Sequence, residues 1–298
     1  MHNTPLSRWL GILIMLLISC IMGANHIAAR IAFDHGVNVT TAVTMRSGGT
    51  AIAVLALLLL FRVPLRLPAP ALRRALLIGV LLAVQGYCLY SAVARIPVVL
   101  ALLALNIYPM LLTLITWAAG GARPTPLALG AMAVGLFGLA LALDITGRSG
   151  DIAGRWQEIG VGLSYALTAA LSFSVAMFLS GRWLKDVDGR LRSCLAMATV
   201  AVIVGTAGVL SGSLAAPTDT PGWIGLTLLT LFYGSGITAM FIVLPRIAIT
   251  SDTGALSFEP IAALFMGWFL LGQGLSPLQG LGAVIVIAAI IVLGTAKR

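Results

Sequence analysis

The chain has 298 residues, of which 60% are hydrophobic and only 9% are charged, and its formal net charge is +9. A soluble domain has about 25% charged residues, so this composition excludes a soluble globule and indicates an integral membrane protein. The basic residues lie in short loops between apolar runs, where they set membrane orientation, so we expect a lipid bilayer and no nucleic acid as a partner.

Apolar runs of about 20 residues, the length that crosses a bilayer, follow one another through the chain. They predict an all-α integral membrane protein with ten transmembrane helices, near residues 9–31, 39–61, 75–94, 97–119, 126–143, 157–181, 193–214, 222–244, 253–271 and 278–296. With the N-terminus in the cytoplasm, most Lys and Arg residues of the loops fall on the inner side. This asymmetry predicts a multi-pass protein of the bacterial inner (plasma) membrane with both termini cytoplasmic.

An internal repeat divides the chain into two parts. A shift of 151 residues lays Pro109, Trp117 and Pro126 over Pro260, Trp268 and Pro277. Each copy holds five predicted helices, and the odd number makes the second copy enter the membrane in the opposite orientation. We therefore expect two inverted five-helix repeats, residues 1–146 and 155–298, which is the sequence signature of a secondary transporter.

The last helices of each copy also carry a family resemblance. The segments Asn106-Ile-Tyr-Pro109 to Leu136 and Leu256-Ser-Phe-Glu-Pro260 to Leu293 resemble the EamA family of the drug/metabolite transporter superfamily. Within that superfamily, the size and layout are similar to the YddG-type exporters of aromatic amino acids. The resemblance implies export of small organic metabolites and a substrate cavity between the two copies.

Two prolines and a carboxylate interrupt the predicted helices. Pro109 and Pro260 each remove a backbone donor, so the helix should kink or open there, and we expect both to act as hinges. Glu259 precedes the second proline inside an apolar run, where an ionised group costs roughly 2.5–3.5 kcal/mol. It has three interpretations: a proton-coupling carboxylate, a site for a substrate ammonium group, or half of a structural pair with a basic residue such as Arg246.

Two basic side chains lie inside predicted helices of the first copy. His26 shares a helix face with Arg30 and is a second coupling candidate, or it hydrogen-bonds a neighbouring carbonyl while Arg30 reaches the outer interface. Arg46 lies about seven residues into the second helix. It either attracts a substrate carboxylate or makes a structural hydrogen bond to carbonyls at a helix end.

The predicted substrate contacts combine these charges with aromatic and amide side chains. Such a lining suits neutral, preferably aromatic, amino acids, since aromatic rings bind both apolar groups and cations. The full predicted set is Arg46, Gln85, Tyr87, Tyr90, Asn106, Tyr108, Trp117, Phe258, Glu259 and Trp268.

Enzymatic patterns are missing from the sequence. The three histidines are His2, His26 and His35, the three cysteines are far apart, and no phosphate-binding loop occurs. We therefore expect no enzyme, no catalytic residues, no metal site and no cofactor. The sequence predicts a secondary transporter that exports amino acids or similar metabolites by alternating access, with a proton as a further candidate partner. An amphiphilic drug efflux transporter and a membrane receptor or scaffold that transports nothing are the alternatives.

Overall fold

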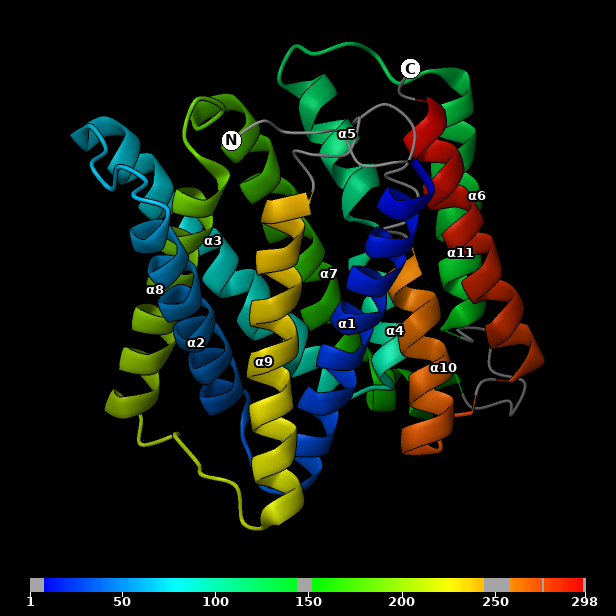
Figure 1. Cartoon of the computed structure of the whole chain (residues 1–298). Helices are drawn as coiled ribbons and strands as arrows, with labels where there is room; N and C mark the ends of the chain where they lie inside the picture. Colours follow the sequence, from blue (N-terminus) through cyan, green and yellow to red (C-terminus); the bar gives the residue numbers. More distant parts are fainter. Residues whose placement is uncertain (1–7, 144–151, 244–257, 275, 297–298) are drawn as a thin grey trace.

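The computed structural model describes residues 8–143, 152–243, 258–274 and 276–296, and these residues form a bundle of helices (Figure 1). Its helices in chain order are α1 (Arg8–Asp34), α2 (Val39–Leu60), α3 (Ala69–Val93), α4 (Val98–Leu105), α5 (Tyr108–Ala118), α6 (Pro126–Ala142), α7 (Ile152–Trp183), α8 (Gly189–Leu210), α9 (Thr220–Val243), α10 (Glu259–Leu271) and α11 (Pro277–Ala296).

The apolar helices confirm an all-helical membrane protein. Seven spans within the described ranges are long and apolar enough to cross a membrane, and one of them, Val98–Ala118, combines α4 and α5. The helices Pro126–Ala142, Glu259–Leu271 and Pro277–Leu293 are apolar but shorter. The count of ten spans therefore stays a prediction.

Some predicted boundaries differ from the observed ones. The third helix begins at Ala69, six residues before its predicted start, because Pro70 is accepted in the first turn, where no backbone donor is needed. The seventh predicted helix begins earlier, at Gly189, because Asp188 caps its first turn. Residues 253–257 of the ninth predicted helix lie outside the described residues.

The helix break predicted at Pro109 is present. The α4 helix ends at Leu105, Asn106 donates its side-chain amide to the carbonyl of Leu102 at 2.8 Å, and α5 starts at Tyr108 with the proline in its first turn. In the second copy α10 starts at Glu259, again with the proline in its first turn. Each copy thus begins a helix at the same position of the repeat.

The packing of the helices follows the repeat. The repeat pairs α1 with α7, α2 with α8, α3 with α9, α4 and α5 with α10, and α6 with α11. When each helix is exchanged for its counterpart, the contacts α2–α8 and α6–α11 stay the same. The contact α1–α9 then maps onto α3–α7, and α2–α9 maps onto α3–α8. Figure 1 shows α6 beside α11 at one side of the bundle and α1 beside α9 at its front.

The interior is apolar and centres on α4. Every residue from Val98 to Ala104 is buried, and this helix packs against α3, α7 and α10. Because the residues packed around α4 are mostly apolar, the buried polar side chains on α1 and α2 are exceptions.

Candidate functional site

A hydrogen-bonded pair joins the two copies. The Nε2 atom of His26 on α1 lies 3.1 Å from Oε1 of Glu259 on α10, although 233 residues separate them in the chain. The side chain of His26 is 5% exposed and that of Glu259 is 29% exposed. Because Glu259 is the first residue of α10, its carboxylate also lies at the positive end of the helix dipole.

Tyr90 on α3 connects this pair to the rest of the site. It is completely buried and its hydroxyl donates to Oδ1 of Asn25 at 3.1 Å. Its ring centroid lies 5.7 Å from that of His26, and Phe33 packs against it edge-on at 6.2 Å. The ring therefore contacts both His26 and a cation on α2.

That cation is Arg46, which is only 4% exposed. Its guanidinium carbon lies 4.8 Å from the ring centroid of Tyr90 and 3.9 Å from that of Tyr233 on α9. Such stacking stabilises a buried cation by ~2 kcal/mol, which is less than the cost of removing the charge from water. No described carboxylate lies within ion-pair distance of this guanidinium.

Several buried polar atoms around Arg46 and His26 have no hydrogen-bond partner in the described part of the chain. They are Nδ2 of Asn25, Nδ1 of His26, Nε of Arg46 and Oγ of Ser47. Buried polar groups are nearly always paired, so a cluster of unpaired ones indicates a place where water or a polar ligand binds. We call Asn25, His26, Arg46, Tyr90, Tyr233 and Glu259 the central cluster.

The repeat gives the central cluster an apolar counterpart. Tyr108 occupies the position of Glu259 in the first copy, and its ring packs against Phe173 with centroids 4.8 Å apart. Ser174, the counterpart of Gly23, donates its hydroxyl to the backbone carbonyl of Tyr108 at 3.0 Å. Equivalent helices thus meet in both copies, with ionisable groups in one and aromatic rings in the other.

The ten predicted contact residues lie in different parts of the structure, some in the central cluster and some on the surface. Arg46, Tyr90 and Glu259 belong to the central cluster, together with the coupling candidate His26. The amide of Asn106 is used at the end of α4, and Gln85 and Phe258 are partly buried. Of the remaining four, Tyr108 packs against Phe173, and the other three are exposed: Tyr87 by 40%, Trp117 by 44% and Trp268 by 63%.

The contacts of Arg30 and Arg46 bear on the alternative roles that the sequence left open for the charged residues. Arg30 lies near the end of α1, where Nε contacts Asp34 at 3.0 Å and Nη1 donates to the carbonyl of Val93. Arg46 stacks on rings, and no helix-end carbonyl among the described residues accepts from it. Arg246, the suggested partner of Glu259, lies outside the described residues.

Sequence reasoning missed Tyr233 and Asn25 as members of the cluster. Tyr233 directly precedes Gly234-Ser-Gly236, a run of small residues that lets another helix approach closely. The available signal was that Tyr233 lies next to a place where another helix can approach closely, which favours a contact with that helix. Its contact with Arg46 could not be read from periodicity, because periodicity relates side chains on one helix only.

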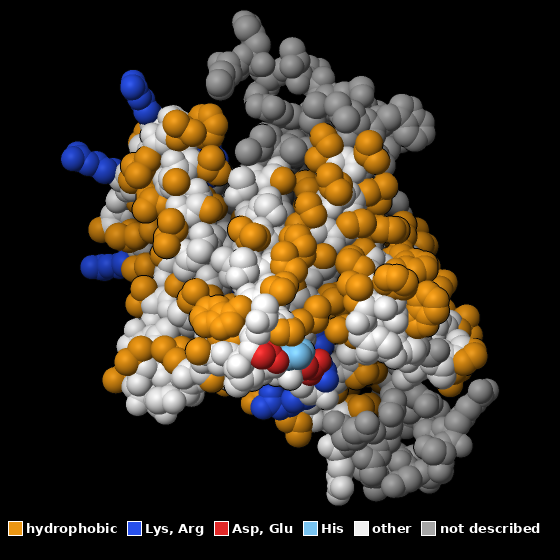
Figure 2. Space-filling view, turned by 60° about the horizontal axis from the view of Figure 1, so that its bottom comes forward, with side chains coloured by type: hydrophobic (Ala, Val, Ile, Leu, Met, Phe, Trp, Pro, Cys, Tyr) orange, Lys and Arg blue, Asp and Glu red, His pale blue; other side chains and the backbone are white. Residues whose placement is uncertain are grey.

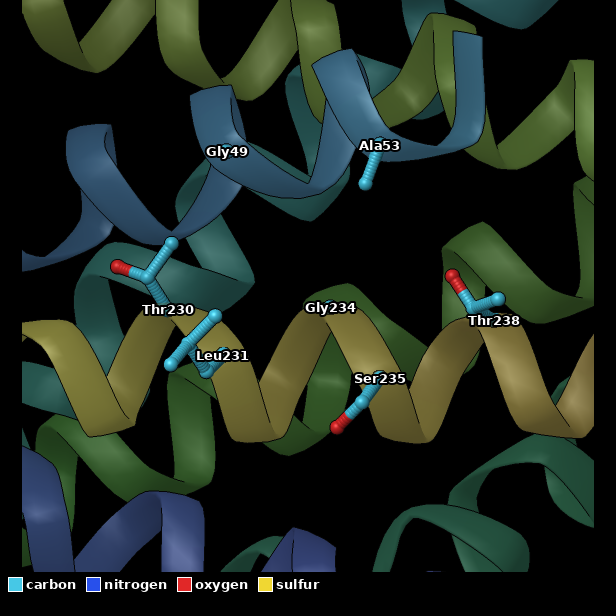
Figure 3. A pocket seen from close by; sticks show the side chains of 7 residues that line it. All are labelled: Gly49, Ala53, Thr230, Leu231, Gly234, Ser235 and Thr238. Atoms are coloured by element: carbon cyan, nitrogen blue, oxygen red, sulfur yellow. The ribbon is translucent and has the colours of Figure 1, made fainter. Parts of the chain in front are cut away.

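A groove of about 230 Å³ lies beside the cluster, between α2 and α9 (Figure 3). Its lining consists of Gly49, Ala53, Thr230, Leu231, Gly234, Ser235 and Thr238. The hydroxyls of Thr230 and Ser235 donate to carbonyls of their own helix, so they leave the groove wall largely apolar.

The repeat explains why the groove is there. A Cβ atom on Gly49 would lie 2.5 Å from Thr230, and at the equivalent α3–α8 contact a Cβ on Gly79 would lie 2.6 Å from Thr199. Beyond this close contact the 151-residue shift lays Val204 of α8 over Ala53 in the groove wall of α2. Smaller side chains in one of two equivalent interfaces leave the space unfilled.

The comparisons with known proteins agree with this architecture. The sequence profile described as "EamA-like transporter family" matches residues 9–143 and again residues 160–295. The chain therefore belongs to the EamA-like transporter family, whose members are membrane transporters within the drug/metabolite transporter superfamily and not enzymes.

Solved structures share the fold, and 26 of their chains match. One crystal structure is 19% identical over 98% of this chain and 99% of its own, with a TM-score of 0.64. At this identity the likeness concerns the fold alone. A search of curated protein sequences found no match.

Proposed function

We propose that this member of the family is a secondary transporter that exports small organic metabolites, above all neutral or aromatic amino acids, by alternating access through a central cavity. The observation that carries the proposal is Arg46. It is a buried cation between two tyrosine rings, with an unpaired donor and no carboxylate partner among the described side chains. A substrate carboxylate would supply the missing negative charge and accept a hydrogen bond from the unpaired Nε–H of Arg46.

The architecture of the proposal is ten transmembrane helices in two inverted repeats, residues 1–146 and 155–298, with both termini in the cytoplasm of a bacterial inner membrane. The exchange of packing partners between the copies supports it, as do the two matches of the family profile. The distribution of Lys and Arg residues between the loops supports the orientation.

In this proposal the substrate lies against the central cluster. Its carboxylate faces Arg46, and its aromatic side chain packs near Tyr90, Tyr108 and Tyr233, since rings bind rings well. Its ammonium group approaches Glu259, whose other partner is His26. Gln85, Asn106 and Phe258 are further contacts, and we give the exposed Tyr87, Trp117 and Trp268 no part in binding.

Coupling would use the same carboxylate. A proton or a substrate ammonium group that reaches Glu259 competes with His26 for it, and this contact joins a helix of each copy. Breaking the contact removes a polar link between α10 and α1, and Pro109 and Pro260 mark the positions where each copy can bend. Binding is thereby linked to the relative position of the two repeats.

The test is counterflow in proteoliposomes that contain the purified chain. Preloaded unlabelled phenylalanine should drive uptake of labelled phenylalanine, and the Arg46→Ala variant should lose this activity while Trp268→Phe keeps it. Exchange of a cationic amphiphilic drug without any amino acid exchange would establish drug efflux instead. An absence of counterflow for every compound would favour a receptor or scaffold.

A further inference from the structure

A basic corner forms where two loops meet, at the end of the bundle where α1 begins and α11 ends (Figure 1). The first loop, residues 62–74, joins α2 to α3 and is taken to include the start of α3, and the second, residues 182–192, joins α7 to α8 and is taken to include the adjoining ends of both helices. Residues 62–74 and 182–192 together hold eight of the 18 basic residues and two acidic ones, which leaves a net charge of +6. The basic residues are Arg62, Arg66, Arg73, Arg74, Arg182, Lys185, Arg190 and Arg192.

The two loops are held together by apolar packing. Val63 and Leu67 of the first loop pack against a cluster that contains Leu191 of α8. Trp183 and Val187 of the second loop pack against a cluster that contains Ala75 of α3. The charges of both loops therefore keep a fixed spacing in spite of their separation in the sequence.

Most of these cations have no acidic partner in the part of the chain that the structure describes. Asp188 is occupied by Arg190 at 2.9 Å, and that arginine holds the pKa of the carboxyl below its ordinary value. Arg192 donates one N–H to Ser180 at 3.3 Å, and its Nε atom is buried without a partner. The guanidinium of Arg74 lies 5.9 Å from the ring of Trp183.

Large apolar side chains are exposed directly beside the charges. Leu60 is 73% exposed, Phe61 46% and Leu65 42%, and on α3 Leu72 and Leu76 are exposed by 37% and 42%. Figure 2 shows Lys and Arg side chains projecting from an edge of the molecule whose neighbouring surface is apolar. Basic side chains beside exposed apolar ones match the charged headgroup and the acyl chains of an anionic phospholipid.

We propose that the basic corner binds an anionic phospholipid of the adjacent leaflet. The headgroup phosphate lies among Arg73, Arg74 and Arg192, and the acyl chains run along the exposed leucines. A soluble acidic protein or a free phosphate would satisfy the charges only, and would leave the apolar wall beside them uncovered. The bound lipid then joins the ends of α3 and α8, which belong to different copies. The binding itself does not depend on the transport proposed above.

The experiment measures lipid retention on the full-length protein by native mass spectrometry in a neutral detergent. Phosphatidylglycerol and phosphatidylcholine with identical acyl chains serve as probes. We expect the wild type to retain phosphatidylglycerol preferentially. The double variant Arg73→Gln/Arg74→Gln should bind it roughly 10-fold more weakly or worse, because each basic residue near the surface attracts an anionic lipid. The charge-preserving Arg73→Lys/Arg74→Lys variant should retain most of the affinity.

Arg123→Gln removes a basic residue from another loop and is the matched control, for which we expect unchanged retention. Melting temperatures in the same detergent show whether each variant is folded. Equal retention of both lipids by the wild type would overturn the proposal, and so would an equal loss in the Arg123→Gln control. Displacement of phosphatidylglycerol by an equal concentration of soluble glycerol phosphate would also overturn it, since the acyl chains would then contribute nothing.

Discussion

Replacing Arg46 by alanine separates a binding role from a structural one. The side chain is 4% exposed and stacks on two tyrosines, and the described residues offer it no carboxylate. A hydrogen bond to a charged group contributes about 1.5–3 kcal/mol, so loss of the substrate contact should raise Kd roughly 10- to 150-fold. Folding should suffer little, because removing an uncompensated buried charge also removes its desolvation cost.

The assay compares phenylalanine with phenethylamine, which lacks the carboxylate. Wild-type protein should bind phenylalanine more tightly, and Arg46→Ala should bind the two compounds about equally, as measured by the shift in melting temperature that each compound gives the purified variant. Arg46→Lys keeps the charge but loses the planar guanidinium, so its preference for phenylalanine should lie between those of the wild type and the alanine variant. The reasoning is refuted if the alanine variant keeps the preference for phenylalanine, or if it simply unfolds.

Three further predictions concern other parts of the fold. Glu259→Gln should abolish the stimulation of transport by an imposed pH gradient, since the amide cannot carry the proton; a variant that still responds to the gradient excludes this carboxylate as the carrier. Ala53→Ile places apolar atoms in the α2–α9 groove and should leave the melting temperature unchanged or higher, whereas Gly49→Ile should lower it, because a Cβ there would lie 2.5 Å from the facing threonine. The pKa of Asp219 is held below its ordinary value by a hydrogen bond from the Gly222 backbone and by a neighbouring histidine. Its stabilising effect is therefore fully present above about pH 4, the unfolded value, and is lost as the pH falls through the lower folded value. The melting temperatures of wild type and Asp219→Asn should accordingly differ at neutral pH and converge in acid.

The sequence predicted the local features of the fold well. A proline has no backbone N–H wherever it occurs, so Pro109 and Pro260 predicted a kink or opening where α5 and α10 in fact start, and helix starts were expected close to Pro126 and Pro277 without any knowledge of packing. Boundaries such as that of α3 were less accurate, because a polar cap or an early proline extends a helix beyond its apolar run.

The central cluster was predicted only in part. Helical periodicity placed His26, Arg46 and Glu259 inside the membrane, and their cost there marked them as functional candidates. Which of them meet depends on how α1, α3, α9 and α10 cross, and no spacing along the chain contains that information. For the same reason, equal aromatic character did not distinguish the buried Tyr90 from the exposed Trp268.

The glycine and threonine at the two equivalent helix contacts show how the two halves of the chain differ. Gly49 faces Thr230, and Thr199 faces Gly79, so each close contact takes its small residue from the first copy and its threonine from the second. Two identical first halves would place glycine opposite glycine and leave a void. Two identical second halves would bring two threonines together where only one fits. The two halves are therefore complementary at these contacts, each of which combines a glycine of the first copy with a threonine of the second.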